Sequence, residues 1–164
     1  MQIAPRNAEV ARTSALRRAA QAALDAARVR RSVSLTIVIT GDAALRKLNR
    51  EFLGIDAPTD VLSFPFQIGR PGRSLRSIPE VERRGLRPAR SNYLGDVIIS
   101  LARARAQARI GGHALIDELR LLVIHGVLHL LGHDHGTTEE KQHMWILQAK
   151  ALKQAGAWIK GPAQ

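Results

Sequence analysis

The stretch from His125 to His135, HGVLHLLGHDH, decides how the rest of the chain has to fold. It continues an apolar run, Leu115 to Ile124, that has helical length and few helix-breaking residues. His125 and His129 are four residues apart and should therefore lie on one face of that helix. Gly132 is placed to end the helix in a left-handed turn, so that the chain can fold back and present His135 as a third nitrogen ligand.

Three imidazoles at this spacing predict a zincin-like metal site. A catalytic Zn²⁺ commonly has three protein ligands and an open fourth position for the water that becomes the nucleophile. Single histidines carry no such signal, so His113 and His143 are interpreted as core or surface residues. Metalloproteases with this spacing have a glutamate directly after the first histidine as general base, whereas this chain has Gly126. The glycine argues against peptide hydrolysis by that route.

Length and composition favour one domain in a reducing compartment. We expect a single domain over residues 1–164, large enough for a hydrophobic core. The absence of cysteine excludes disulfides and thiolate metal sites and favours the cytoplasm. No apolar run reaches the roughly 18 to 20 residues of a membrane span, and the start, MQIAPRNAEV, has no signal-peptide core. Neither a membrane nor export is therefore expected.

The net charge of +11 is unevenly distributed along the chain. Residues 1–112 contain 20 Lys and Arg against 9 Asp and Glu, whereas residues 113–164 contain 5 of each. Basicity confined to one part of the chain favours a polyanionic partner, nucleic acid above all. The six aromatic residues (two Trp, one Tyr and three Phe) are not interleaved with the arginines. Contact with RNA is therefore expected mainly through phosphates rather than through stacked bases.

Helices and strands alternate along the chain. Amphipathic helices are expected over residues 7–29 and from Asp42, as N-cap, to about Phe52. A short basic helix should end at Gly111–Gly112, and a final helix should run from near Thr137 to about Gln154. The expected strands are Ser32–Thr40, Val61–Phe64 and Tyr93–Ser100. This order predicts an α+β, α/β-like fold whose sheet is at least partly parallel and covered by helices.

Residues 67–92 are interpreted as a long basic surface loop that is mobile in isolation. The segment contains seven arginines but only two acidic residues, Glu80 and Glu82. An insertion without function and a segment that contacts RNA explain this composition equally well. The arginines are Arg70, Arg73, Arg76, Arg83, Arg84, Arg87 and Arg90.

Four segments together resemble the YbeY family of bacterial endoribonucleases, also called rRNA maturation factors. They are HGVLHLLGHDH, PTDVLSFPF at Pro58 to Phe66, LGDVIIS at Leu94 to Ser100 and LNREF at Leu48 to Phe52. The resemblance implies a single domain with a mixed, mostly parallel sheet of about four strands and surrounding helices. It implies one Zn²⁺ ion held by His125, His129 and His135. It also implies single-strand-specific cleavage of RNA, maturation of the 3′ end of the 16S ribosomal RNA of the small subunit, and ribosome quality control.

Two positions depart from the family pattern. Members commonly have an arginine just after the aromatic that matches Phe52, where this chain has Leu53. A leucine cannot stabilise charge on a phosphodiester as a guanidinium does, so Arg50 or Arg46 is the candidate replacement. At His133 the family often has an aromatic residue, and the imidazole is either a ring-for-ring replacement or an auxiliary proton carrier.

The predicted function is a zinc-dependent endoribonuclease acting on ribosomal RNA, without a small-molecule cofactor. Asp134, beside His135, is expected either to orient a ligand imidazole or to cap the turn. The candidates for binding RNA phosphates are Arg46, Arg50, Arg103 and Arg105. A ribosome assembly factor with a structural metal and a metal hydrolase of another substrate, such as peptide, are the alternatives. The sequence leaves open whether the nucleophile is water or the ribose 2′-hydroxyl, and whether the ion is zinc, nickel or copper.

Overall fold

The computed structural model describes residues 2–4, 10–66, 92–134 and 136–159. Almost all of the expected basic loop, residues 67–92, lies outside this range, and so does His135. Among the described residues, no helix is long and apolar enough to cross a membrane.

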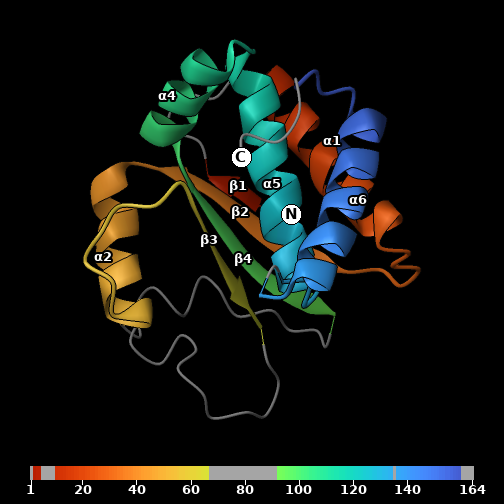
Figure 1. Cartoon of the computed structure of the whole chain (residues 1–164), viewed down its shortest axis with the longest axis horizontal. Helices are drawn as coiled ribbons and strands as arrows, with labels where there is room; N and C mark the ends of the chain where they lie inside the picture. The colour runs from red at the N-terminus through yellow and green to blue at the C-terminus, as the bar shows by residue number, and fades with distance from the viewer. Residues whose placement is uncertain (1, 5–9, 67–91, 135, 160–164) are drawn as a thin grey trace.

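A mixed sheet forms the centre of the fold (Figure 1). Its strands are β1 (Gln2–Ala4), β2 (Ser34–Thr40), β3 (Val61–Pro65) and β4 (Tyr93–Ser100), in the order β1-β2-β4-β3. The pairs β1–β2 and β2–β4 are parallel, and the edge strand β3 is antiparallel to β4. The α+β class and the mixed sheet are confirmed. Strands β2, β3 and β4 are those expected from the sequence, whereas β1 was not expected.

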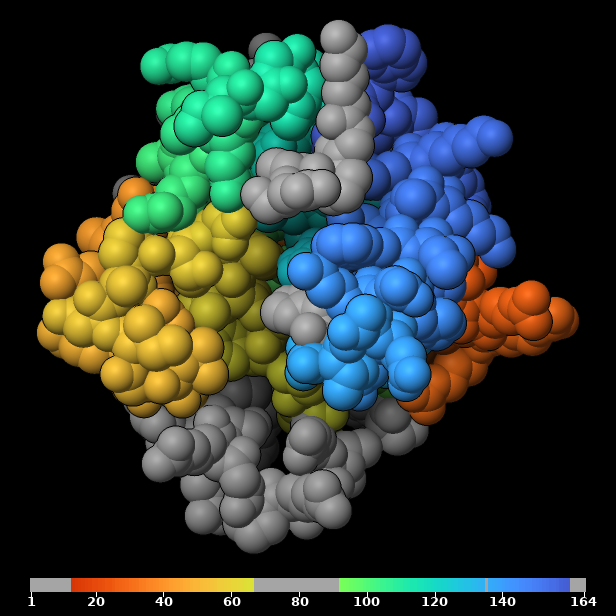
Figure 2. All heavy atoms as spheres, in the orientation of Figure 1, coloured from red at the N-terminus to blue at the C-terminus, as the bar shows by residue number. Residues whose placement is uncertain are grey.

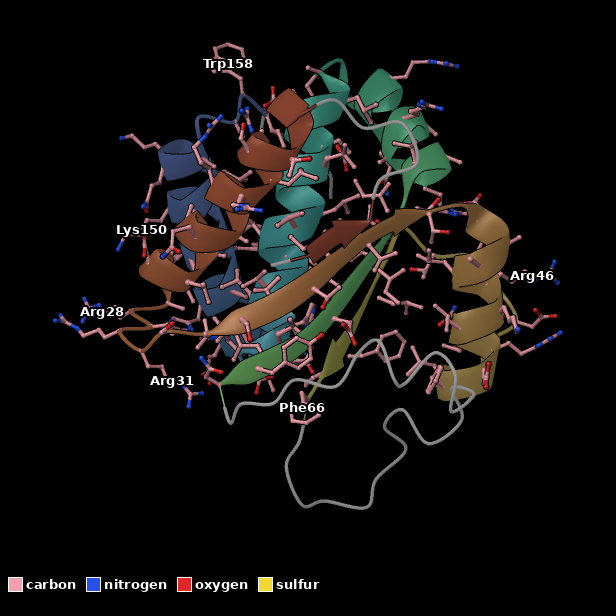
Figure 3. All side chains as sticks on the ribbon, turned by 180° about the vertical axis from the view of Figure 1, so that it is seen from behind. Arg28, Arg31, Arg46, Phe66, Lys150 and Trp158 are labelled. Atoms are coloured by element: carbon pink, nitrogen blue, oxygen red, sulfur yellow. The ribbon has the colours of Figure 1, made fainter. Side chains whose placement is uncertain are left out.

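The helices are α1 (Val10–Ala26), α2 (Asp42–Leu53), α4 (Leu101–Gly111), α5 (Leu115–Leu130) and α6 (Thr138–Ala155). Helices α1, α5 and α6 contact one another in one layer, and α5 also contacts β3 and β4 (Figure 1). Seen from behind, the sheet lies in front of α5, with α2 beside it (Figure 3). Helix α5 is therefore sandwiched between the sheet and the other helices.

Helix α5 is the most buried helix because apolar residues occur on nearly all of its sides. Leu119, Val123, Ile124, Val127 and Leu128 are at most 1% exposed. No side of α5 is fully exposed to solvent, so the packing of the neighbouring elements determines how far each of its polar side chains is buried.

Gly126 lets α5 approach the sheet closely. A Cβ atom at this position would lie 2.5 Å from Cγ1 of Val97 on β4 and 3.1 Å from Oγ of Ser63 on β3. The Ser63 hydroxyl donates a hydrogen bond of 3.1 Å to the Gly126 carbonyl oxygen. Because no side chain separates the backbones, this contact fixes the depth at which α5 sits on β3 and β4.

The expected ends of α5 and α6 are confirmed. Gly132 has a φ of +88°, as a left-handed turn after α5 requires. Thr137 caps α6 with a full capping box, in which its hydroxyl accepts from the Glu140 N–H and the Glu140 carboxylate accepts from the Thr137 N–H. Gly156 then ends α6 with a φ of +68°.

Two helix boundaries differ from the expectation, and β2 begins at Ser34 rather than at Ser32. Gly41, not Asp42, is the N-cap of α2, and no side chain caps that end. The Asp42 carboxylate is instead occupied by the Ser100 hydroxyl, which donates to it from the end of β4. Helix α1 ends at Ala26 rather than at residue 29, because the chain turns at Arg28, whose φ is +59°.

Candidate metal and RNA site

His125 and His129 point their imidazoles at one another from successive turns of α5. Their Nε2 atoms are 3.1 Å apart and their ring centroids are 4.6 Å apart, with 76° between the ring planes. Two nitrogens bound tetrahedrally at about 2.0–2.1 Å from one zinc ion lie about 3.3 Å apart. The observed separation therefore fits two ligands of one ion. Both histidines are partly buried.

The third expected ligand, His135, lies outside the described residues. Within the described ranges, no group of three or more His, Cys, Asp or Glu side chains is arranged to hold a metal. The turn that leads to His135 is described, and its His133 N–H donates to the Leu128 carbonyl oxygen at 3.1 Å. The two described nitrogens fit a metal, and the completion of the site by His135 stays a prediction.

Gln148, on α6, holds His125 from behind. Its Oε1 atom lies 3.0 Å from Nδ1 of His125, and the residue is 8% exposed. A carbonyl oxygen only accepts, so this contact places the imidazole proton on Nδ1 and leaves the Nε2 lone pair facing His129. Sequence reasoning missed Gln148. The available signal was a glutamine on the buried face of a helix, in step with Met144 and Ala151.

Gly126 follows His125 but does not face the site. It is buried against Val97 and Ser63, so a glutamate side chain here would have to enter the packed layer between α5 and the sheet. The absence of the protease general base therefore has a steric cause as well as a chemical one. No single substitution at this position would supply a carboxylate to the histidines.

The arginines proposed to replace the missing family arginine are not equivalent. The Arg46 guanidinium donates to both carboxylate oxygens of Asp56, at 2.8 and 3.0 Å, and this hydrogen bonding lowers the pKa of Asp56. Arg46 is thus already engaged, and it projects from the outer side of α2 (Figure 3). Arg50 is exposed in the last turn of α2, and Leu53 at the end of the helix is 56% exposed.

The other two candidate RNA contacts lie on α4, which packs beside α2. Arg103 is partly buried, with its Nε 3.6 Å from the Asp42 carboxylate. Arg105 is exposed on the same helix. All four candidate arginines therefore lie on two neighbouring helices, α2 and α4, whereas His125 and His129 lie on a third helix, α5.

His133 and Asp134 lie in the turn after α5. The His133 ring is 5.3 Å from the ring of His143 on α6, measured between centroids. Partial burial lowers the pKa of His133, and the nearby His143 lowers it further. Asp134 is exposed. These positions leave the proposed proton-carrier and orienting roles untested.

Two aspartates of the family segments have structural contacts that the sequence did not predict. Asp60 accepts from the Val61 N–H at 2.8 Å and from the Gln107 amide at 2.9 Å, and its carbonyl oxygen accepts from the Ser100 N–H at 2.7 Å. It therefore joins β3, β4 and α4. Asp96 is 6% exposed and accepts from the Tyr93 hydroxyl, and burial raises its pKa.

Comparison with known proteins places this geometry in a family. The family model described as Endoribonuclease YbeY matches residues 3–156. The chain belongs to the YbeY endoribonuclease family. Curated YbeY endoribonucleases include relatives from Brevibacillus brevis (40% identical over 122 residues, 74% of each chain), Salinispora tropica (38% over 144 residues, 85% of each) and Moorella thermoacetica (39% over 143 residues, 87% of this chain and 86% of the relative).

A solved structure has the same fold. The solution structure of a protein from Thermotoga maritima matches with a TM-score of 0.58 and 21% identity, over 94% of this chain and 87% of that one. At this identity the likeness concerns the fold alone. The YbeY assignment therefore rests on the family model and on the curated relatives.

Proposed function

We propose that this YbeY family member is a zinc-dependent endoribonuclease that cleaves single-stranded RNA during maturation of ribosomal RNA. The observation that carries the proposal is the convergence of the His125 and His129 Nε2 atoms, 3.1 Å apart, with His125 held from behind by Gln148. A pair of imidazoles so oriented is suited to bind a metal ion. The net charge of +11 suits a polyanionic substrate.

His125, His129 and His135 would hold the ion. When bound, zinc would supply a Lewis acid for the scissile phosphate and would make water acidic enough to react near neutral pH. Gln148 keeps the His125 ring in the tautomer that a metal ligand needs. The chain's own part in the reaction is thus to fix two nitrogens on a rigid helix.

The RNA strand would approach through the hollow in front of α5. In the space-filling view, part of α5 shows at the bottom of a depression between β3 with the segment before it on one side and α6 on the other (Figure 2). Arg46 and Arg50 of α2 are both exposed, but the Arg46 guanidinium is held by Asp56. Arg50 is therefore the better candidate for the phosphate contact that Leu53 cannot make.

The proposed natural substrate is the 3′ end of the small-subunit ribosomal RNA, with a further role in ribosome quality control in the cytoplasm. Support comes from the resemblance of the four sequence segments and from the basic first two thirds of the chain. Phosphate contacts predict affinity that falls steeply as salt rises.

One observation favours a second candidate function. Leu53 is exposed where the family commonly has an arginine, so the chain has lost a group suited to stabilising a cleaved phosphodiester. A ribosome assembly factor that keeps the metal for structure would tolerate this loss. Peptide hydrolysis is disfavoured because Gly126 faces the sheet.

A cleavage assay with His129→Ala tests the proposal. Wild type is expected to cut a ribosomal RNA fragment with an unpaired 3′ region, and His129→Ala to lose this activity. His143→Ala, which removes an exposed histidine of α6, is the matched control and should retain activity. Activity unchanged in His129→Ala would refute the metal mechanism. A wild type that binds the fragment without cutting it would favour the assembly factor.

Two further readouts refine the mechanism. Products ending in 2′,3′-cyclic phosphate would identify the ribose 2′-hydroxyl as nucleophile, and other ends would point to water. Arg50→Ala should weaken RNA binding and flatten its salt dependence, whereas Arg46→Ala should do so less, because Arg46 is paired with Asp56. Equal effects of the two variants on RNA binding would refute the proposal that Arg50 rather than Arg46 contacts the phosphate.

A further inference from the structure

Beside the histidine pair, an apolar groove of about 920 Å³ runs along α6. Its walls include Leu121 of α5, Trp145, Gln148 and Leu152 of α6, and Trp158 beyond the end of α6. Arg120 ties the end of α6, where Gly156 lines the groove, to α5, because its Nη1 atom donates to the Gly156 carbonyl oxygen at 3.1 Å and to Asp117 at 2.7 Å. The groove is at the upper end of the roughly 300–1,000 Å³ typical of ligand sites.

The groove lies behind the candidate metal site, on the side of His125 that faces Gln148. Leu121 stands one helical turn before His125, so both lie on the same face of α5. Gln148 lines the groove and also lies 3.0 Å from Nδ1 of His125. Helices α5 and α6 lie side by side in Figure 1, which places groove and histidines along one seam. A ligand in the groove would therefore be separated from His125 by one side chain, that of Gln148.

The walls of the groove carry exposed indoles. Trp145 is 41% exposed and Trp158 is 76% exposed, and Trp158 projects at the end of the described chain (Figure 3). Exposed tryptophans offer flat faces on which the bases of a single strand can stack, whatever the sequence. Solvent exposure of two such rings in one groove is otherwise unfavourable, so a ligand that covers them would be stabilising.

Cations stand beside these rings. The Lys141 Nζ atom lies 4.7 Å from the Trp145 ring centroid, within cation–π distance, and Lys153 lines the groove. Aromatic faces combined with lysines match a nucleic acid strand, which presents bases and phosphates together. An apolar segment of a partner protein would match the rings but would gain nothing from the lysines.

We propose that this groove, behind the histidine pair, binds unpaired bases of the RNA strand that is cut. The inference rests on the proposed function and adds a base-binding subsite to it. It also adds base stacking to the expectation that RNA is contacted mainly through phosphates. Affinity for single-stranded RNA would then have a part that does not depend on salt, supplied by stacking on Trp145 and Trp158.

Tryptophan fluorescence tests the subsite directly, because Trp145 and Trp158 are the two tryptophans of the chain and both line the groove. The wild-type protein is titrated with a 2′-O-methyl oligouridine, which lacks the reactive hydroxyl, and with an abasic strand of equal length and charge. The base-containing strand should change the emission with saturation, and the abasic strand should bind more weakly with little change. Trp145→Ala should weaken binding of the oligouridine by about fivefold or more.

Controls separate folding, stacking and catalysis. Trp145→Phe keeps a stacking ring and should retain part of the affinity, and Ile110→Ala removes an apolar side chain that is 87% exposed on α4 and should change nothing. Equal effects of the base-containing and abasic strands would overturn the inference even if RNA is cleaved. Emission unchanged by either strand would also overturn it and would leave a protein segment as the occupant. Base-dependent quenching without any cleavage by wild type would support the subsite and refute the proposed function.

Discussion

Replacing Gly126 with alanine should force α5 away from the sheet. The new Cβ would lie 2.5 Å from Cγ1 of Val97, 3.1 Å from its Cγ2 and 3.1 Å from Oγ of Ser63. Carbon atoms in favourable contact are about 3.5–4.0 Å apart, so the helix or Val97 has to move by about 1 Å. Overpacking of this kind costs about 1–3 kcal/mol, and the better helix propensity of alanine offsets up to about 1 kcal/mol.

The sharper measurement is a double-mutant cycle with Val97→Ala. Val97 is fully buried, so its truncation alone destabilises the protein, but it also vacates the space that the new methyl group needs. Urea unfolding should show the double variant to be more stable than the sum of the single effects by about 1–3 kcal/mol. Gly41→Ala is the control, because its Cβ meets nothing within 4 Å, and it should show no coupling to Val97→Ala.

The same set of variants should also differ in their affinity for zinc. Moving α5 displaces His125 relative to Gln148 on α6, so Gly126→Ala should bind zinc more weakly and the double variant should recover part of the loss. If the free energies of unfolding add within about 0.5 kcal/mol, the close packing of Gly126 on Val97 is not what fixes the helix.

Other consequences can be checked one at a time. Gln148→Ala should lower zinc affinity about 10- to 100-fold in competition with a chromophoric chelator, whereas Gln148→Glu, which keeps an acceptor for His125, should lower it less. Because burial raises the pKa of Asp96, the stabilising contribution of this group is full below about pH 4 and is lost as the pH rises through the folded-state pKa. Asp96→Asn should therefore gain stability relative to wild type on going from about pH 4 toward neutrality, and parallel unfolding curves across this range would contradict the assignment. Thr137→Ala removes the capping box and should cost about 0.5–2 kcal/mol in thermal or urea unfolding, with Thr137→Ser close to wild type. Zinc at about one hundred times its Kd should stabilise the protein by about 2.7 kcal/mol, an effect that a chelator reverses, and no shift would argue against a metal bound by the folded state.

The sequence was sufficient for elements whose signals are local. Alternating β-branched residues predicted β2, and short apolar segments predicted the buried strands β3 and β4, each within two residues of its bounds. The spacing of Thr137 and Glu140 predicted the cap of α6. Gly132 was likewise expected at positive φ because few other residues adopt it. Features that depend only on residues close together in the sequence were therefore predicted correctly.

Features that depend on distant parts of the chain were missed. Asp42 has the sequence of an N-cap, but the Ser100 hydroxyl, 58 residues away, occupies its carboxylate. The Gln148–His125 contact joins residues 23 apart on two helices, and the pairing of Arg46 with Asp56 depends on the loop after α2. For the site, the sequence indicated the two imidazoles that converge, but the partner that orients one of them required the packing of α6 on α5.

The placement of the histidines on α5 has a consequence for how the protein can change. The same sixteen-residue helix supplies the centre of the core and two of the three proposed metal ligands, and a glycine sets how closely it packs on the sheet. Selection for a different metal or a different substrate cannot reshape this part of the site without also altering stability. Substitutions on α2, on α4 and on the exposed side of α6 disturb the core less. Changes in substrate choice should therefore accumulate on these helices, while the sequence of α5 stays nearly invariant.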